Sequence, residues 1–204
     1  NVNIASSSII SNNSGELINI GKSTSNVEQL NSSEQNYPEN QEVSKNSGTD
    51  GFTFTYVDSY EELIADIRGA NRDITEVVVH WTAHFNNQGQ VGSEEMHNIG
   101  VRGGFSGNSY HYVIKKDGRL QRGRPLNKIG AHAKENGHDK YSIGIGIVGG
   151  YNCNSNNPNY SDFLNAESIT SEQWSTIDQF LTAFYAVHPG GQVWGHNDTD
   201  LTKV

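Results

Sequence analysis

VVVHWTA, residues 77–83, is a run of β-branched and apolar side chains interrupted by a single histidine, His80. A short run of this kind, rich in valine, predicts a buried strand. VWGHND, residues 193–198, repeats the pattern and places His196 at the end of a second expected strand. An imidazole at the exit of a core strand is held rigidly, and two such exits side by side can bind a metal ion. The two stretches therefore predict a core sheet with His80 and His196 together.

Expected strands and helices alternate from about Gly51 onward, which predicts an α/β fold with a single mixed central sheet and helices packed on it. Helices are expected from Asp58 or Ser59 to about Ala70, from near Ser93, and from Thr170 to the Pro-Gly-Gly stop at residues 189–191. Further strands are expected at residues 110–115, 119–122, 141–148 and 192–195. In the last helix an apolar face is expected from Trp174, Ile177, Phe180, Leu181 and Phe184.

Residues 1–50 differ from the rest of the chain in composition. They contain 11 Ser and 10 Asn with one aromatic residue, Tyr37, so they cannot bury enough apolar surface to offset chain entropy. We expect two parts: residues 1–50 as a Ser/Asn-rich linker or docking arm, and residues 51–204 as the folded domain. Because the chain begins at Asn1 and its single methionine is Met96, we also expect it to be a processed piece or a segment of a longer protein.

Charge and composition exclude several classes of protein. The net charge is −9, and no Lys/Arg cluster is present, which argues against nucleic acid as the main partner. The longest apolar runs, such as residues 143–148, are too short to span a bilayer, so no membrane span is expected. Cys153 is the single cysteine, so no internal disulfide is possible.

Three more segments complete a recognisable pattern: SYHYVI at residues 109–114, GAHAK at 130–134 and SIGIG at 142–146. Together with the two histidine stretches, in this order and spacing, they resemble the zinc-dependent N-acetylmuramoyl-L-alanine amidases, the family of bacteriophage T7 lysozyme and the animal peptidoglycan recognition proteins. The resemblance covers roughly residues 74–204. It is specific because five separate segments agree.

The resemblance implies a zinc site. His80 and His196 match the two histidine ligands of the family. The third ligand is a Cys or Asp about eight to ten residues after the second histidine, which leaves one coordination position for water. In this chain that window begins at Val204, the last residue. We therefore expect the chain to contain two of the three ligands and to be truncated at its C-terminal end.

The resemblance also assigns roles around the metal. Tyr110 matches a tyrosine that assists proton transfer near the metal-bound water, and Lys203 matches a lysine that stabilises the oxyanion. His132 lies in a segment that lines the cleft, and we expect it to bind substrate or to support the site from behind. His111 is expected to point to the opposite side as a hydrogen-bonded core residue. The remaining histidines are expected at the surface or at helix ends: His84, His97, His138 and His188.

The predicted function is hydrolysis of the amide between N-acetylmuramic acid and L-alanine in peptidoglycan by a zinc-activated water. One alternative is a peptidoglycan-binding module of the same fold without catalysis. Another is a phage virion or secretion-machine component in which residues 1–50 dock onto phage structural proteins. The sequence does not predict where the protein is located. It predicts only that the protein acts on the cell wall.

Overall fold

The computed structural model describes residues 51–85, 88–134, 137–151 and 168–199, together with the backbone of residues 9–11 and 17–19. The chain divides into two units, residues 1–42 and 43–204. In the first unit β1 (Ile9–Ser11) and β2 (Leu17–Asn19) pair with each other in antiparallel fashion. The expectation that residues 1–50 form a linker or docking arm falls largely outside the described residues and stays a prediction.

The second unit contains a mixed central sheet, as the sequence predicted, and among the described residues its five strands lie in the order β5-β4-β6-β3-β7. β3 (Glu76–Trp81) pairs in parallel with both β6 (Ser142–Ile147) and β7 (Gln192–Gly195). β4 (Tyr112–Ile114) is parallel to β6 and forms an antiparallel hairpin with β5 (Leu120–Arg122). The C-terminal ends of the parallel strands β3 and β7 therefore lie next to each other. His80 lies near the end of β3, and His196 directly follows β7.

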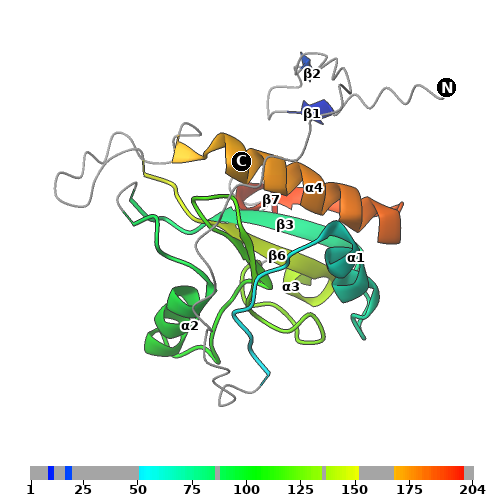
Figure 1. The fold of residues 1–204 in the computed structure, drawn as a ribbon. Helices are drawn as coiled ribbons and strands as arrows, with labels where there is room; N and C mark the ends of the chain where they lie inside the picture. The colour runs from blue at the N-terminus through cyan, green and yellow to red at the C-terminus, as the bar shows by residue number, and fades with distance from the viewer. Residues whose placement is uncertain are drawn as a thin grey trace. The chain divides into compact units, whose positions relative to one another are not determined.

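Side chains alternate along each strand, so each face of the sheet carries its own set of residues. Different helices cover the two faces. On one face α1 (Tyr60–Arg68) and α4 (Ser171–Val187) pack over the main apolar core, which contains Ile143 and Ile145 of β6. On the other face α2 (Ser93–Arg102) covers a small cluster formed by Val91, Met96, Val113 and Val148, and the short α3 (His138–Tyr141) lies nearby (Figure 1). This second face leaves room for polar side chains.

The helices begin where the sequence places their capping residues. The Ser59 hydroxyl accepts the backbone N–H of Glu62 at the start of α1. Thr170 and Gln173 form a reciprocal capping box at the start of α4, since each side chain accepts the other's backbone N–H. Local sequence therefore decides both helix starts.

The buried face of α4 differs from the prediction in one respect. Trp174 was expected on the apolar face, but it is 46% exposed, whereas Gln173 is fully buried. The Gln173 Nε2 group donates to the carbonyl oxygens of Ile114 and Val148, and so joins the helix to β4 and to the end of β6. The buried amide of Gln173 is satisfied by these two carbonyls, as buried polar groups usually are, and the next residue, Trp174, faces outward.

None of the helices among the described residues is long and apolar enough to cross a membrane.

Candidate metal centre and active site

The ends of β3 and β7 bring His80 and His196 together. His80 is the fifth residue of β3, and His196 begins the 3-10 helix η4 (His196–Thr199), which directly follows β7. The centroids of the two imidazole rings are 4.7 Å apart. Because β3 and β7 are hydrogen-bonded neighbours in parallel register, this proximity follows from the sheet order.

The His80 ring is buried and electrically neutral. The residue is 5% exposed, and the pKa of its imidazole is lowered to about 2, mainly by burial and to a smaller extent by the neighbouring His132 and His196. A neutral imidazole keeps one nitrogen lone pair free, which is the form that binds a metal ion.

His196 has a buried ring nitrogen that lacks a protein partner. Its Nδ1 atom is among the buried polar atoms for which the described part of the structure offers no hydrogen bond. The backbone around it is well held: the N–H of Gly195 donates to Asp198 Oδ2 at 3.0 Å, and the Thr199 hydroxyl donates to the carbonyl of His196 at 2.7 Å. A buried polar atom without a protein partner is a candidate for contact with an ion or a water molecule.

The donor set fits zinc, although the described residues alone do not complete a centre. Across residues 51–85, 88–134, 137–151 and 168–199, no group of three His, Cys, Asp or Glu side chains is arranged to hold a metal ion. Two imidazoles at adjacent strand ends are typical zinc donors. Lys203 and the segment from Asp200 onward, where the sequence places the oxyanion lysine and the approach to the third ligand, lie outside the described residues.

Tyr110 lies beside His80, just before β4. Its ring centroid is 5.2 Å from that of His80. Burial raises the pKa of its phenol to about 12, so the hydroxyl keeps its proton near neutral pH and can donate a hydrogen bond. The backbone N–H of Tyr110 donates to Oδ1 of Asn108 at 2.9 Å, and the fully buried Asn108 in turn donates from Nδ2 to the carbonyl of Ser93 on α2. Asn108 therefore fixes the backbone that carries Tyr110.

Glycines in β6 make space for these side chains. A Cβ atom on Gly144 would overlap the ring of His132, and one on Gly146 would lie 2.7 Å from Cδ2 of Tyr110. The absence of a side chain at these two positions therefore leaves the space that the rings of His132 and Tyr110 occupy.

His132 was expected to bind substrate or to support the site, and the structure places it in contact with His80. The His80 Nε2 and His132 Nδ1 atoms are 2.9 Å apart. Burial lowers the pKa of His132 to about 2, so its ring is neutral, and the 3.8 Å approach of the Asp139 carboxylate to Nε2 is not an ion pair. The carboxylate instead accepts the backbone N–H groups of His132 and Ala133 at 2.8 and 2.7 Å.

His111 is a buried, hydrogen-bonded residue, as the sequence predicted, and its ring lies beside that of His132 with centroids 5.8 Å apart. Its Nδ1 accepts the N–H of Gly144 at 2.9 Å, so the proton is on Nε2, which lies 3.0 Å from the carbonyl oxygen of Lys128. Burial lowers the pKa of His111 to about 3. It is a hydrogen-bonded core residue that ties β6 to the loop before His132.

Two of the other histidines differ from the expectation. His84 and His97, expected at the surface or at a helix end, are 8% and 7% exposed. The His84 ring is hydrogen-bonded to the Thr82 hydroxyl, and the His97 ring packs edge-on against Phe52 and Phe54. His138 and His188 do lie at the ends of α3 and α4.

Three supporting residues had no distinctive signal in the sequence: Asn108, Asp139 and Ser142. Each is a common polar residue in or beside a loop, and its partner lies in another segment of the chain. Spacing alone cannot show such contacts.

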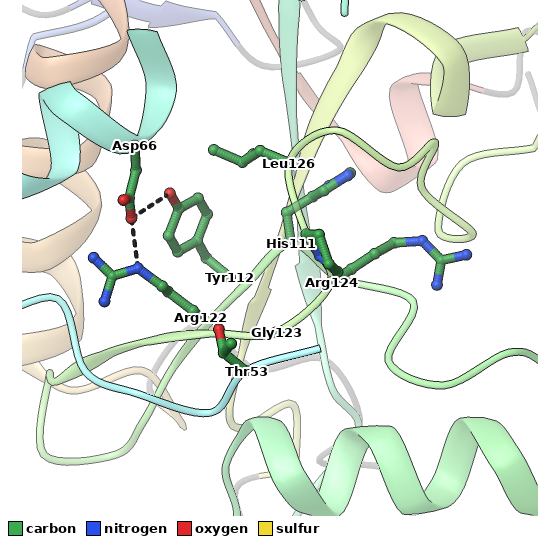
Figure 2. Close-up of a pocket in the computed structure, with 9 residues that line it drawn as sticks. Thr53, Asp66, His111, Tyr112, Arg122, Gly123, Arg124 and Leu126 are labelled. Carbon is green, nitrogen blue, oxygen red and sulfur yellow. Dashed lines mark hydrogen bonds and ion pairs between the residues drawn. The ribbon is translucent and has the colours of Figure 1, made fainter. Parts of the chain in front are cut away.

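A separate cavity of about 150 Å³ lies near His111. In it the Tyr112 hydroxyl and the Arg122 guanidinium both donate to Asp66 Oδ2, which joins α1 to the β4–β5 hairpin (Figure 2). Its lining includes neither His80 nor His196, so it is a structural junction distinct from the candidate metal centre.

Comparison with known proteins identifies relatives in sequence. Residues 70–203 match the family described as N-acetylmuramoyl-L-alanine amidase. The endolysin of Enterobacteria phage K11 is 25% identical over 127 residues, which cover 62% of this chain and 77% of the endolysin. The endolysin of Escherichia phage T7 is 34% identical over 88 residues, or 43% of this chain and 56% of that protein.

Solved structures agree on the fold. The endolysin amidase LysCS from Clostridium intestinale URNW has a TM-score of 0.51 at 24% identity, over 74% of this chain and 82% of its own. The bumblebee recognition protein PGRP-SA has a TM-score of 0.50 at 16% identity, over 74% and 78% of the two chains. At these identities the match shows the shared fold alone.

Proposed function

This chain belongs to the N-acetylmuramoyl-L-alanine amidase family, and we propose that it hydrolyses the amide between N-acetylmuramic acid and L-alanine in peptidoglycan with a zinc ion held by His80 and His196. The observation that carries the zinc proposal is the buried, unpartnered Nδ1 of His196 beside the neutral ring of His80. The family pattern places the third ligand, a Cys or Asp, in the window that begins at Val204.

Zinc, when bound, would lower the pKa of a water molecule and polarise the scissile carbonyl. The residues of this chain then have separable tasks. His80 and His196 would hold the metal ion from adjacent strand ends. The Tyr110 phenol, which keeps its proton, donates a hydrogen bond or relays a proton at the reacting centre. Lys203 is proposed to stabilise the negative oxygen that develops on the carbonyl.

The proposal is tested by substituting one ligand. In the full-length protein, His80→Ala should lose most of its zinc and abolish release of free stem peptides from purified peptidoglycan, because one of three ligands is removed. His188→Ala is the matched control, since His188 lies at the end of α4, outside the site. Zinc content measured by elemental analysis and peptide release measured by chromatography decide the outcome. Unchanged activity and zinc content in His80→Ala would contradict the proposal.

A non-catalytic role remains the second candidate, because the fold is shared with a recognition protein. Such a module would sediment with insoluble peptidoglycan without releasing peptides. The same preparation of wild-type protein distinguishes the two: release of peptides supports the amidase, whereas binding without release supports the module.

A further inference from the structure

His132 has no exposed side-chain surface with which to meet a substrate. Its side chain is 0% exposed, and its ring packs edge-on against His80 with centroids 4.9 Å apart. The close polar contact is between its Nδ1 atom and His80 Nε2, at 2.9 Å. This geometry describes a residue that acts on His80 rather than on a ligand in solution.

The protons of the two rings can be assigned from this contact. If His80 binds the metal ion, it must do so through Nδ1, because Nε2 is directed at His132. A neutral imidazole that binds metal through Nδ1 carries its proton on Nε2. That proton is then donated to Nδ1 of His132, and the proton of His132 lies on Nε2, which is 3.3 Å from the Ser142 hydroxyl oxygen.

We propose that His132 is a positioning residue, which accepts the Nε2–H of His80 and so fixes the tautomer and ring orientation in which Nδ1 faces zinc. This inference rests on the zinc site proposed above. Metal-binding histidines commonly donate their second ring N–H to an acceptor in the protein, and loss of that acceptor costs about 10–100-fold in metal affinity. Here the acceptor is a second, neutral imidazole.

The surroundings of His132 hold it in this role. The Asp139 carboxylate fixes the backbone on both sides of His132, because it accepts the N–H groups of His132 and Ala133. Ser142 meets the far side of the ring, and Gly144 leaves the space that the ring fills. The orientation of the ring is therefore determined by contacts with the loop that carries Asp139, with β6 and with His80.

Zinc affinity is the decisive measurement, made by competition with a chromophoric chelator on the full-length, metal-free protein. We expect His132→Leu to bind zinc about 10–100-fold more weakly than wild type. The visible absorption of the cobalt-substituted protein should also change, because the ring of one ligand is no longer fixed. His188→Leu, outside the site, should bind zinc as wild type does. Thermal unfolding of the metal-free proteins separates these effects from a general loss of folding.

Two conservative variants make the test specific. The oxygen of Asn in His132→Asn lies near the position of Nδ1, whereas Gln in His132→Gln reaches toward the position of Nε2. Tighter zinc binding by the Asn variant than by the Gln variant supports the proposal even if the Leu variant does not fold, and equal binding by the two overturns it.

The wild-type protein separates this inference from the function on which it rests. Absence of zinc binding in wild type would contradict the proposed metal centre itself. Normal zinc binding in wild type together with unchanged affinity and an unchanged cobalt spectrum in a folded His132→Leu would overturn the positioning role alone.

Discussion

At the scale of single residues, the candidate site depends on side chains that are neutral because they are buried. His80 and His132 have pKa values lowered to about 2, and the pKa of Tyr110 is raised to about 12. Desolvation is the largest cause in each case, since it penalises the charged form. The site thus offers uncharged imidazoles and an uncharged phenol across the range of neutral pH.

Tyr110→Phe tests the phenol. The ring and its packing against His80 are kept, so zinc content and thermal stability should stay close to wild type. The turnover number should fall by about 100-fold or more, which is the usual contribution of a group that transfers or donates a proton. Steady-state peptide release measures the effect. Retention of full activity would show that the hydroxyl of Tyr110 has no part in the reaction.

Gly144→Ala tests the space behind His132. A Cβ atom at this position would overlap the His132 ring, so the ring must shift from the position in which it contacts His80. We expect weaker zinc binding together with a destabilisation of about 1–3 kcal/mol, the usual cost of overpacking. Gly190→Ala is the matched control, because a Cβ on Gly190 meets no atom within 4 Å. Denaturant unfolding and chelator competition on both variants would reveal whether the space is needed.

At the scale of elements, α4 is attached to the sheet by a polar residue as well as by its apolar face. Gln173 caps the helix with its oxygen and donates from Nε2 to the carbonyls of Ile114 and Val148. Two strands are thereby joined to the first turn of one helix. The periodicity of apolar residues cannot show this, because a glutamine at a helix start reads as a capping residue only.

Gln173→Leu should therefore destabilise the protein more than loss of the cap alone. Thr170→Ala removes one capping interaction, worth about 0.5–2 kcal/mol. Gln173→Leu in addition removes the Nε2 donor from the Val148 and Ile114 carbonyls; the Ile114 carbonyl still accepts the N–H of Val148, so we count about 1–3 kcal/mol for the Val148 carbonyl alone. Urea unfolding gives the comparison, with the exposed Ser171→Ala as a control near zero. A Gln173→Leu variant no less stable than Thr170→Ala would argue against the link to the sheet.

At the scale of the whole molecule, the five-stranded sheet separates an apolar face under α1 and α4 from a face that carries the polar site. Figure 1 shows α4 lying along the sheet, with α2 on the other side. The site is placed where parallel strands end next to each other, which is a common location for functional residues in α/β sheets.

Acid should destabilise the fold through the buried histidine His111. Its pKa is about 3 in the folded protein and 6.5 as the ordinary value, so the unfolded chain binds its proton more readily. Its contribution to stability is complete above pH 6.5 and is lost progressively as the pH falls toward 3. Between these values it adds up to about 1.4 kcal/mol per pH unit to the slope of the unfolding free energy. His111→Gln should show a smaller slope in denaturant titrations at a series of pH values, and an unchanged slope would contradict this assignment.

Residues 1–50 should be dispensable for hydrolysis. The family match begins at residue 70, and the described contacts of the candidate site all come from residues beyond 70. A protein beginning at Gly51 should fold and keep kcat/KM within a few fold of the longer protein, as expected for a polar segment that lacks a core of its own. A loss of 100-fold or more would mean that the first 50 residues complete the site or the core.

The sequence by itself determined the elements and their order. Valine-rich and isoleucine-rich runs predicted the strands, Ser59 and Thr170 predicted two helix starts, and five spaced segments predicted the family, because these signals depend on near neighbours in the chain. Strand order and parallel pairing then explain why His80 and His196 meet, as the sequence predicted.

Only the tertiary structure decided which polar side chains are buried and what they contact. His84 and His97 are buried despite polar surroundings in the sequence, and Gln173 takes the buried position expected for Trp174. His132 meets His80 from 52 residues away. Such contacts depend on how distant segments pack, and a buried polar atom is stable only where packing also supplies its partner. Periodicity records which face of an element is apolar, but it carries no information about that partner.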